Sequence, residues 1–546
     1  MSGLSVSVRR WLGLMAIALG VALIVVDTTI VNVITPSVIE DIGIDSSQAQ
    51  WIQESYAIIF AALLLLVGRI SDLRGARPVF ILGVVIFGVT SLIAGAAPNG
   101  EVLILGRFLQ GLGAALILPT SLSLLNRMFT GKARGQAFAI WGSTIGAATA
   151  LGPVLGGWLS EHSSWRWAFG INIPLTILIL ILAMLFITPT PRTRGRVDGI
   201  SASLSILGLG LLAFGLVEGR VYGWVTSQRA FELFGGTWDS GLSPAFIALV
   251  LAVILLVGFV WRQIIVSRGT GRHEPLMDVK LFSIASFRNG NIATLIIGLG
   301  EFGIIAVMPL WLQFTLDYTP LQAGLALVPI AVGSFVASGI SFPLTAKVSP
   351  LGLVRLGLAL EVVGLAGLGI VAAASDAQWW LIALVLFFYG IGVGFATSQV
   401  TNVVLADVPE EEGGQSSGIQ STFRQLGSAL GIAALTTVFF STLSSNLRDR
   451  LANAGLPADQ VAKLSEAVSD SAGAVIEPLS NNPATASVAD AAREAMTQAL
   501  TFGSYLAAGF LVVGVIATFL IPNTRKAELQ AGSEPAVADE MSTSQP

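Results

Sequence analysis

Three ionisable residues stand inside stretches that are otherwise apolar enough to cross a bilayer: Asp27, Glu54 and Arg107. Each such residue costs about 2.5–3.5 kcal/mol on membrane-insertion scales, so residues of this kind usually serve a function. With a cytoplasmic N terminus and a helical rise of about 1.5 Å per residue, all three lie in the outer half of the membrane. Burial favours the protonated form of a carboxyl group, whereas a nearby arginine favours the ionised form. We therefore identify the three as candidates for proton coupling; the alternative is a static ion pair with Arg107.

Two further acids, Glu301 and Glu361, fall near mid-membrane in the second half of the chain. They are candidates for substrate binding, although a lone membrane acid can also be paired with a neighbouring hydroxyl or backbone group. Aromatic faces can bind cations and amide side chains can donate hydrogen bonds, but both types also serve as interface anchors or as packing contacts. The additional substrate-binding candidates of these types are Gln53, Tyr56, Gln110, Trp311, Gln313 and Phe314.

The composition indicates that the ionisable residues above lie on membrane helices. Of the 546 residues, 54% are hydrophobic and 11% are charged, whereas soluble domains have about 25% charged residues. Apolar runs near the length of about 20 residues that a spanning helix needs predict fourteen transmembrane helices. Most of the 29 Lys and Arg residues cluster in loops that the positive-inside rule then assigns to the cytoplasm, together with both termini.

Several classes of chemistry are missing from the sequence. The chain has no cysteine, and its two histidines, His162 and His273, fall in predicted loops, so we expect neither disulfides nor a metal site. No Ser-His-Asp pattern or glycine-rich phosphate loop is present, so we expect no enzyme and no cofactor. The net charge of -4 does not indicate a nucleic-acid partner.

Two segments are not membrane spans. Residues 442–499 contain "PADQVAKLSEAVSD" and "ASVADAAREAMTQAL", whose helical spacing of apolar residues predicts an extracytoplasmic hairpin of two amphipathic helices. Residues 526–546 lack apolar periodicity and are rich in Ser, Glu, Pro and Ala, which predicts a disordered cytoplasmic tail.

The turn after the second span reads "GRISDLRGARPVF" and contains Gly68, Asp72, Gly75 and Arg77. Glycines permit a close helix approach and a tight reversal. The carboxylate of Asp72 can accept from the N-terminal amides of a neighbouring helix or pair with an arginine. This combination predicts a conformational latch that favours one access state.

The fifth span contains "GSTIGAATALGPVLGGWL", in which Gly146, Gly152, Gly156 and Gly157 leave a face without side chains. Such a face lets another helix pack backbone to backbone. Pro153 removes one intrahelical hydrogen bond and should kink the span.

These motifs resemble those of the major facilitator superfamily. The turn resembles its signature Gly-x-x-x-Asp-Arg-x-Gly-Arg-Arg, with Leu73 and Ala76 in place of arginines. The fifth span resembles the antiporter motif Gly-x-x-x-Gly-Pro-x-x-Gly-Gly, with Ala148 at the first glycine. The stretches "VDTTIVNVITPSV", "WIQESY", "GRFLQGLGAALILP" and "RQLGSALG" look like the fourteen-span drug:proton antiporter branch, whose exporters carry coupling or cation-recognition acids at the positions of Asp27 and Glu54.

The resemblance implies an all-α integral membrane protein with the major facilitator fold. Six-helix bundles would occupy residues 1–190 and 289–525, and two linking spans would lie in 191–288. The implied function is proton-coupled export of amphipathic, cationic drugs by alternating access, in a bacterial cytoplasmic membrane, by a monomer that contacts small-molecule substrates, protons and the lipid bilayer. The alternative is proton-driven export of one endogenous metabolite or lipid. A receptor would not require the residues of rocking helices.

Overall fold

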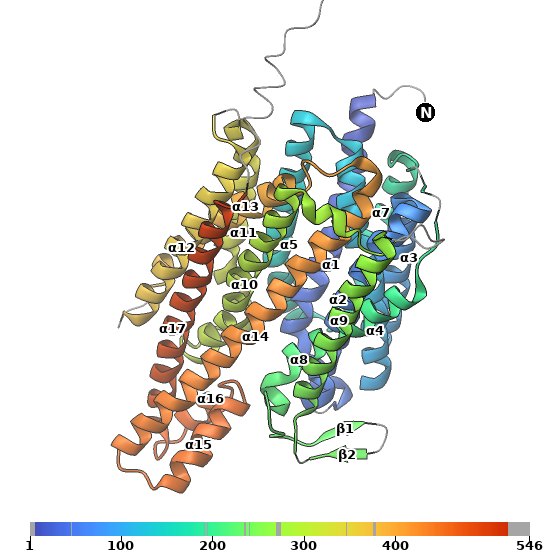
Figure 1. Cartoon of the computed structure of the whole chain (residues 1–546). Coiled ribbons are helices and arrows are strands. Elements are labelled where there is room, and N and C mark those ends of the chain that lie inside the picture. The colour runs from blue at the N-terminus through green and yellow to red at the C-terminus, as the bar shows by residue number, and fades with distance from the viewer. Residues whose placement is uncertain are drawn as a thin grey trace, which may run out of the picture.

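The chain forms a bundle of long helices that run roughly parallel to one another (Figure 1). The computed structural model describes residues 6–521, apart from 45, 191, 194, 234–235, 240, 269–274, 346 and 375–377. Within these residues, fourteen helices are long and apolar enough to cross a membrane, which confirms the expected number of spans. The tail expected at 526–546 lies outside the described residues.

The first six spans form the N bundle, with its sixth span broken into two short helices. They are α1 (Val6–Ile42), α2 (Ser46–Arg74), α3 (Ala76–Gly95), α4 (Gly100–Met128), α5 (Gly131–His162), and α6 (Arg166–Gly170) followed by α7 (Asn172–Phe186).

The last six spans form the C bundle. They are α10 (Ala285–Phe314), α11 (Pro320–Thr345), α12 (Pro350–Ala373), α13 (Trp379–Val404), α14 (Gly413–Asn453) and α17 (Ala486–Thr518). Two short 3-10 helices, η1 (Val279–Ser283) and η2 (Glu410–Glu412), precede α10 and α14. The beginning of α1 and the end of α17 lie at the same end of the molecule, the upper end in Figure 1.

Two accessory spans, α8 (Gly199–Tyr222) and α9 (Pro244–Arg268), lie in front of the bundles in Figure 1. The helix α8 packs against α2 of the N bundle and α14 of the C bundle. Their connecting loop contains an antiparallel pair, β1 (Phe231–Leu233) and β2 (Gly236–Trp238), that the sequence did not lead us to expect. Such a short pair is marginal alone; here the Phe231 ring packs edge-on against Phe214 and Tyr222 of α8.

The segment between the last two spans projects from the lower end of the molecule (Figure 1). It contains α15 (Ala458–Asp470) and α16 (Ile476–Ser480), and Val468 and Ile476 are buried. The second expected amphipathic stretch is not a separate helix, because residues from Ala486 onward form the first turns of α17. The long spans α14 and α17 therefore extend continuously into this outer segment.

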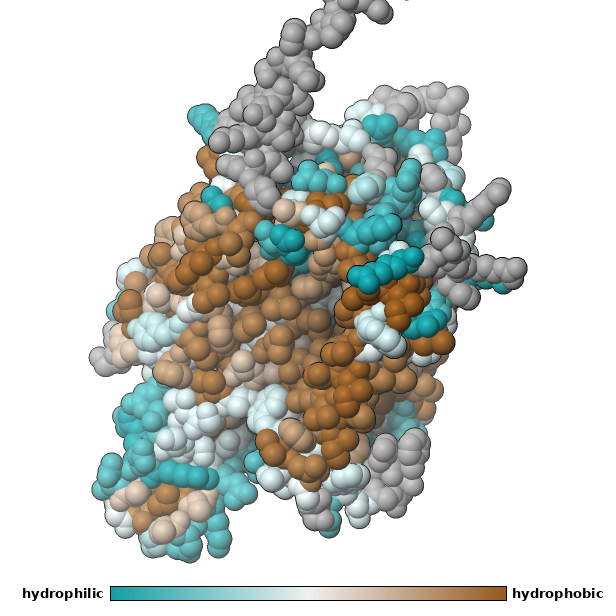
Figure 2. Space-filling model, viewed as in Figure 1, coloured by the Kyte–Doolittle hydropathy of each residue, from teal (hydrophilic) through white to brown (hydrophobic). Residues whose placement is uncertain are grey.

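The distribution of surface polarity matches a membrane environment. Figure 2 shows a hydrophobic belt across the middle of this face and hydrophilic residues toward both ends. Side chains exposed on α9, such as Val253, Ile254 and Val257, belong to such an apolar surface. Because lipid provides no hydrogen-bonding groups, spanning helices with internally satisfied backbones are the arrangement that this composition permits.

Candidate functional site

Asp27 of α1 is fully buried in the N bundle and accepts hydrogen bonds from three side chains. The Nη1 atom of Arg107 lies 2.5 Å from Oδ2 of Asp27. Nδ2 of Asn172 and Nε2 of Gln110 donate to Oδ1 over 2.8 and 3.3 Å. The hydroxyl of Ser91 accepts from both amides, over 2.7 Å from Gln110 and 3.2 Å from Asn172. Residues of α1, α3, α4 and α7 thus converge around one carboxylate.

Arg107 is held by further contacts in addition to Asp27. Its Nε donates to the backbone oxygen of Ile52 over 3.1 Å, and its Nη1 donates to Oε1 of Gln110 over 2.9 Å. The guanidinium lies 4.3 Å from the centre of the Tyr56 ring. Buried charges are stable when they are paired and hydrogen-bonded, and each of these two side chains has several such partners.

Glu54 of α2 lies on a part of the helix that contacts α8. Trp51, three residues earlier on α2, stacks on Phe214 of α8 with ring centres 6.2 Å apart, and Glu54 follows on the same helical face. The charge of Glu54 acts on Tyr222 of α8, as does that of Glu218. The structure therefore places the two N-bundle acids in different environments, with Asp27 inside the bundle and Glu54 toward α8.

A second group of charged residues lies inside the C bundle. Glu301 of α10 is buried, and its Oε2 lies 4.0 Å from Nη2 of Arg424 on α14. The hydroxyl of Tyr389 on α13 donates to the backbone oxygen of Glu301 over 2.9 Å. Glu361 of α12 is fully buried and experiences the charges of Glu301 and Arg424. The two C-bundle acids are thus brought into one electrostatic neighbourhood.

The remaining substrate-binding candidates are distributed over separate places. Gln110 and Tyr56 belong to the Asp27 cluster, and Gln53 lies on the same helix as Tyr56. Three others lie at the far end of α10, about three helical turns beyond Glu301: Trp311, Gln313 and Phe314. The structure does not bring these three residues to the charged clusters.

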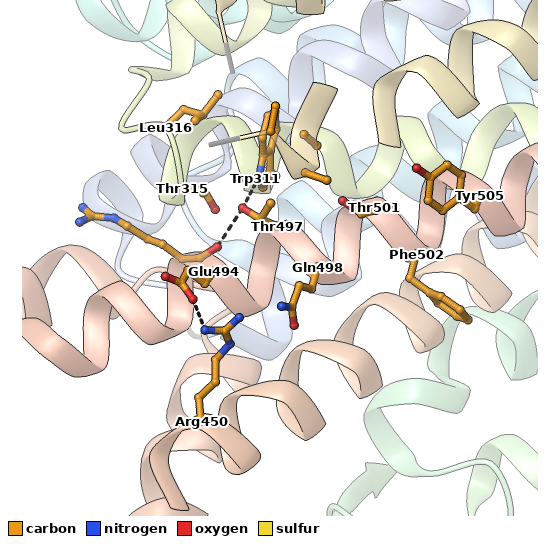
Figure 3. A pocket seen from close by; sticks show the side chains of 14 residues that line it. Trp311, Thr315, Leu316, Arg450, Glu494, Thr497, Gln498, Thr501, Phe502 and Tyr505 are labelled. Atoms are coloured by element: carbon orange, nitrogen blue, oxygen red, sulfur yellow. Dashed lines mark hydrogen bonds and ion pairs between the residues drawn. The ribbon is translucent and has the colours of Figure 1, made fainter. Parts of the chain in front are cut away.

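Trp311 instead lines an outer pocket of about 770 Å³ between α10, α12, α14 and α17. Its indole nitrogen donates to the Thr497 hydroxyl over 3.1 Å, and Arg450 pairs with Glu494 at the same pocket (Figure 3). The ring of Phe502 lines the pocket further along α17.

The turn between α2 and α3 connects the two bundles at Asp72. Its Oδ1 accepts from the backbone nitrogen of Gly414 over 2.8 Å, and its Oδ2 accepts from that of Gln415 over 2.7 Å. Nη2 of Arg127 also donates to Oδ1 over 3.1 Å. Both partner types named from the sequence, helix N-terminal amides and an arginine, are therefore in contact with Asp72. Gly68, one turn earlier, lies so close to α14 that an added Cβ would be 2.7 Å from the Gly414 oxygen.

The other residues of the turn fix its direction. Gly75 has a φ of 89°, a left-handed conformation that favours glycine, and it precedes α3. Arg77 donates through its backbone nitrogen to the Thr190 hydroxyl over 3.4 Å and through Nη2 to the Met184 oxygen over 2.7 Å. After the role and side that the sequence predicts for them, we call the turn residues Gly68, Asp72, Gly75 and Arg77, together with the N terminus of α14, the cytoplasmic latch.

The latch is connected to the accessory spans by the linker that precedes α10. Nε2 of Gln415 donates to the backbone oxygens of Pro275 and Leu276, each over 3.0 Å. Oε1 of Gln263 on α9 accepts from the backbone nitrogens of Leu276 and Met277, over 2.8 and 3.1 Å. Two buried glutamines thus hold the same linker.

The network continues into α8. Nε2 of Gln263 donates to the Ser201 hydroxyl over 2.7 Å, and Ser201 donates to Asp198 over 2.6 Å. Arg262 donates to both carboxylate oxygens of Asp198, over 2.8 and 3.2 Å. The Arg262 hydrogen bonds, followed by those of Ser201, hold the pKa of Asp198 well below its ordinary value.

The glycines of the fifth span face two different helices. An added Cβ would overlap Thr29 of α1 at Gly152 and would lie 3.0 Å from a side-chain carbon of Ile30 at Gly156. On the other face, an added Cβ would overlap an α11 side chain at Gly146 and would lie 3.2 Å from the α11 backbone at Gly157.

Pro153 belongs to the same contact between the bundles, because an added Cβ on Gly324 of α11 would lie 3.1 Å from the Pro153 Cβ. The helix α5 therefore packs closely within the N bundle on one face and against the C bundle on the other.

Four residues with prominent contacts were not identified as site residues from the sequence: Ser91, Asn172, Arg127 and Arg424. Ser91 and Asn172 lie on α3 and α7, and a single sequence does not show which helix faces meet. Arg424 lies in the stretch "RQLGSALG". Like Arg107, it is an arginine inside an apolar span, and this property could have identified it from the sequence. In the part of the chain that the structure describes, no three His, Asp or Glu side chains are grouped so that they could hold a metal ion.

Comparison with known proteins identifies the family. Residues 17–432 match the sequence model of the family described as the Major Facilitator Superfamily. The puromycin resistance protein pur8 of Streptomyces alboniger is 33% identical over 460 residues, which cover 81% of this chain and 84% of that protein. The multidrug efflux pump LfrA of Mycolicibacterium smegmatis is 30% identical over 502 residues, which cover 92% of this chain and 94% of that protein.

The fold has solved counterparts as well. The human organic anion transporter MFSD10 superposes with a TM-score of 0.58 at 13% identity, covering 93% of this chain and 99% of that one. At this identity the similarity concerns the fold alone. Together with the fourteen spans, these findings show that the chain is a multi-pass membrane protein that belongs to the Major Facilitator Superfamily, in its branch of drug and antibiotic efflux transporters.

Proposed function

We propose that this protein exports amphipathic, cationic drugs across a bacterial cytoplasmic membrane in exchange for protons. The observation that carries the proposal is the buried contact of 2.5 Å between Asp27 and Arg107. A carboxylate in this position changes its proton affinity strongly when the arginine approaches or withdraws. A rearrangement of the helices can therefore load or release a proton at Asp27. Both termini face the cytoplasm in this proposal.

The cytoplasmic latch supports alternating access. Asp72 of the N bundle binds the first amides of α14 in the C bundle, so this contact must break when the bundles separate at that end. Carboxylates are favoured at helix N termini because the amide groups and the helix dipole both stabilise negative charge. The latch accordingly stabilises a state that is closed toward the cytoplasm, with Gly68, Gly75 and Arg77 shaping the contact.

The glycines of α5 support a seal that works while the bundles rock. Gly152 and Gly156 hold α5 to α1 inside one bundle, whereas Gly146, Gly157 and Pro153 face α11 in the other bundle. The second face carries little side-chain bulk, so the two bundles can change their angle without interlocking.

The preference for cations follows from the buried charges of the two bundles. Asp27 and Glu301 have arginine neighbours, whereas Glu361 is a further acid near the same arginine as Glu301. When an arginine moves away from an acid, a cationic substrate can compensate the negative charge of that acid. Two groups of residues complete the proposed substrate path, an N-bundle wall of Gln53, Tyr56 and Gln110 and an outer part of Trp311, Gln313 and Phe314.

The test uses the purified full chain in proteoliposomes with an acidic interior and two probes. One probe is the lipophilic cation ethidium; the other is puromycin, because the relative pur8 is named for resistance to it. We expect both cations to accumulate inside the vesicles and to leave when a protonophore collapses the pH gradient. Accumulation that does not depend on the gradient, or that favours a neutral analogue over the cation, would contradict the proposal.

A further inference from the structure

Glu361 lies at a close contact between α12 and α13. Gly357 and Gly392 meet there, and an added Cβ on Gly357 would lie 2.7 Å from the Gly392 oxygen. An added Cβ on Gly392 would lie 2.5 Å from Cγ of Glu361. The side chain therefore fills the space that a glycine leaves on the opposite helix, and it is fully buried.

The N bundle contains the same kind of contact with an apolar residue in this place. Gly83 of α3 meets Gly113 of α4, and an added Cβ on Gly113 would lie 3.0 Å from Cβ of Phe87. Phe87 follows Gly83 by the same spacing as Glu361 follows Gly357. The second bundle thus has a carboxyl group at the position where the first has a buried phenylalanine.

The carboxyl group of Glu361 has little to compensate a charge. Among the described residues, neither of its oxygens has a hydrogen-bond partner. The charges that act on it are those of Glu301 on α10 and Arg424 on α14, and Arg424 lies 4.0 Å from Glu301. The Tyr389 hydroxyl of α13 donates to the backbone oxygen of Glu301 instead.

A second negative charge beside Glu301 would be unfavourable in this buried site, because one guanidinium cannot compensate both carboxylates equally. The titratable groups that face Glu361 are Glu301 of α10, Arg424 of α14 and Tyr389 of α13. On α17, Tyr505 lies further out, beside Gly369.

We propose that Glu361 is a second proton-binding site of the transport cycle, carrying its proton while the cytoplasmic latch is closed. The proton comes from water on the outer side and is released when the C bundle rearranges and Arg424 or water reaches the carboxyl group. The proposal rests on the proposed proton coupling, because the Glu361 proton contributes to transport only if a proton gradient drives the cycle.

The first test measures protonation directly and needs no transport. Infrared difference spectra of the purified full chain near neutral pH detect the C=O stretch of a protonated carboxylic acid. We expect this band in the parent protein and in Asp27→Asn, and its loss in Glu361→Gln. A parent protein without the band, or a band of unchanged intensity in Glu361→Gln, would overturn the assignment. Glu361→Gln imitates the neutral form of the side chain, and gel filtration checks that the variant is folded. If the variant does not fold, the band of the parent protein alone decides whether a buried neutral acid exists.

The second test measures the contribution to coupling. Each coupled proton multiplies the attainable substrate gradient about tenfold per pH unit, since a tenfold ratio corresponds to about 1.4 kcal/mol. We expect Glu361→Gln to lower the ethidium gradient about tenfold per pH unit. An unchanged gradient in Glu361→Gln would overturn the role in transport even if the infrared band is present. A parent protein that shows the band but no gradient-driven transport would instead refute the proposed function itself.

Discussion

Asp27 and Asp198 show how one residue type takes two roles according to its surroundings. Asp27 lies inside the N bundle, with Arg107 and two amide side chains around it and no exposed surface. Asp198 lies just outside the spans, where it caps the start of α8 and accepts from Arg262. In the first position we propose that movement of Arg107 loads or releases a proton; in the second, the aspartate stabilises the folded protein.

The first prediction concerns the stability contributed by Asp198. Because Arg262 and Ser201 lower the pKa of Asp198 in the folded protein, the contribution is complete above the unfolded pKa of about 3.9 and is lost as the pH falls through the folded value. We expect Asp198→Asn to cost about 1–2 kcal/mol at neutral pH and progressively less in acid. Thermal unfolding in detergent between roughly pH 7 and pH 3 measures this difference.

Exposed Glu466 of α15, away from the first turn of its helix, provides a control, and Glu466→Gln should leave the melting temperature nearly unchanged at each pH. A difference between Asp198→Asn and the parent protein that grows as the pH falls would contradict the linkage argument.

At the scale of elements, α5 approaches its neighbours through residues that have no side chain. Replacing both Gly152 and Gly156 by Leu inserts side chains against α1, where even a Cβ is already too close. We expect the double variant to insert into the membrane, because the span stays apolar. Its transport rate should fall about tenfold or more, because overpacking a core costs a few kcal/mol. Membrane yield and ethidium efflux from cells measure the two effects.

Gly258 of α9 provides the control, because an added Cβ there meets open space, so Gly258→Leu adds the same bulk without a clash. Full transport by the double variant of α5 would refute the packing argument.

The linker between α9 and α10 is the element that ties the accessory spans to the cytoplasmic latch. Gln263→Leu removes the acceptor of the Leu276 and Met277 amides, and each lost hydrogen bond costs about 0.5–1.5 kcal/mol. We expect faster amide hydrogen exchange at these two residues and unchanged exchange in α3. Gln460→Leu, on the exposed face of α15, is the matched control. Exchange that stays as slow as in the parent protein would contradict this role of Gln263.

The sequence predicted local features of these elements well and their mutual contacts poorly. The partners of Asp72 were predictable because the types and spacing of the residues in the turn limit which groups it can bind. The convergence of Ser91 and Asn172 around Asp27 was not, because it depends on the rotation of α3 and α7, and spans that are apolar on every side leave that rotation undetermined. Glu54 was grouped with Asp27 by its depth in the membrane, and depth does not give the direction of a helix face.

At the scale of the whole molecule, the latch should determine which end of the transporter is open. Asp72→Asn keeps the shape of the side chain but removes the charge that binds the amides of α14. Because the chain has no cysteine, spin labels can be attached at Arg74→Cys and Lys347→Cys, exposed positions at the end of α2 and between α11 and α12. We expect a longer distance between the labels to become populated in Asp72→Asn.

Asp407→Asn serves as the control, because Asp407 accepts from Ser286 within the C bundle and does not bridge the bundles. A distance distribution in Asp72→Asn identical to that of the parent protein would show that the latch does not control this opening.

Proton release on substrate addition to the purified protein, measured across roughly pH 5 to 9, tests directly whether Asp27 carries a coupling proton. We expect Asp27→Asn to bind ethidium but to release one proton fewer per bound substrate than the parent protein. Glu54→Gln should release as many protons as the parent protein does. If the ion pair is only structural, Asp27→Asn leaves Arg107 unpaired at a cost of about 3–5 kcal/mol and lowers the yield of folded protein instead. Proton release that persists unchanged in folded Asp27→Asn would contradict the account.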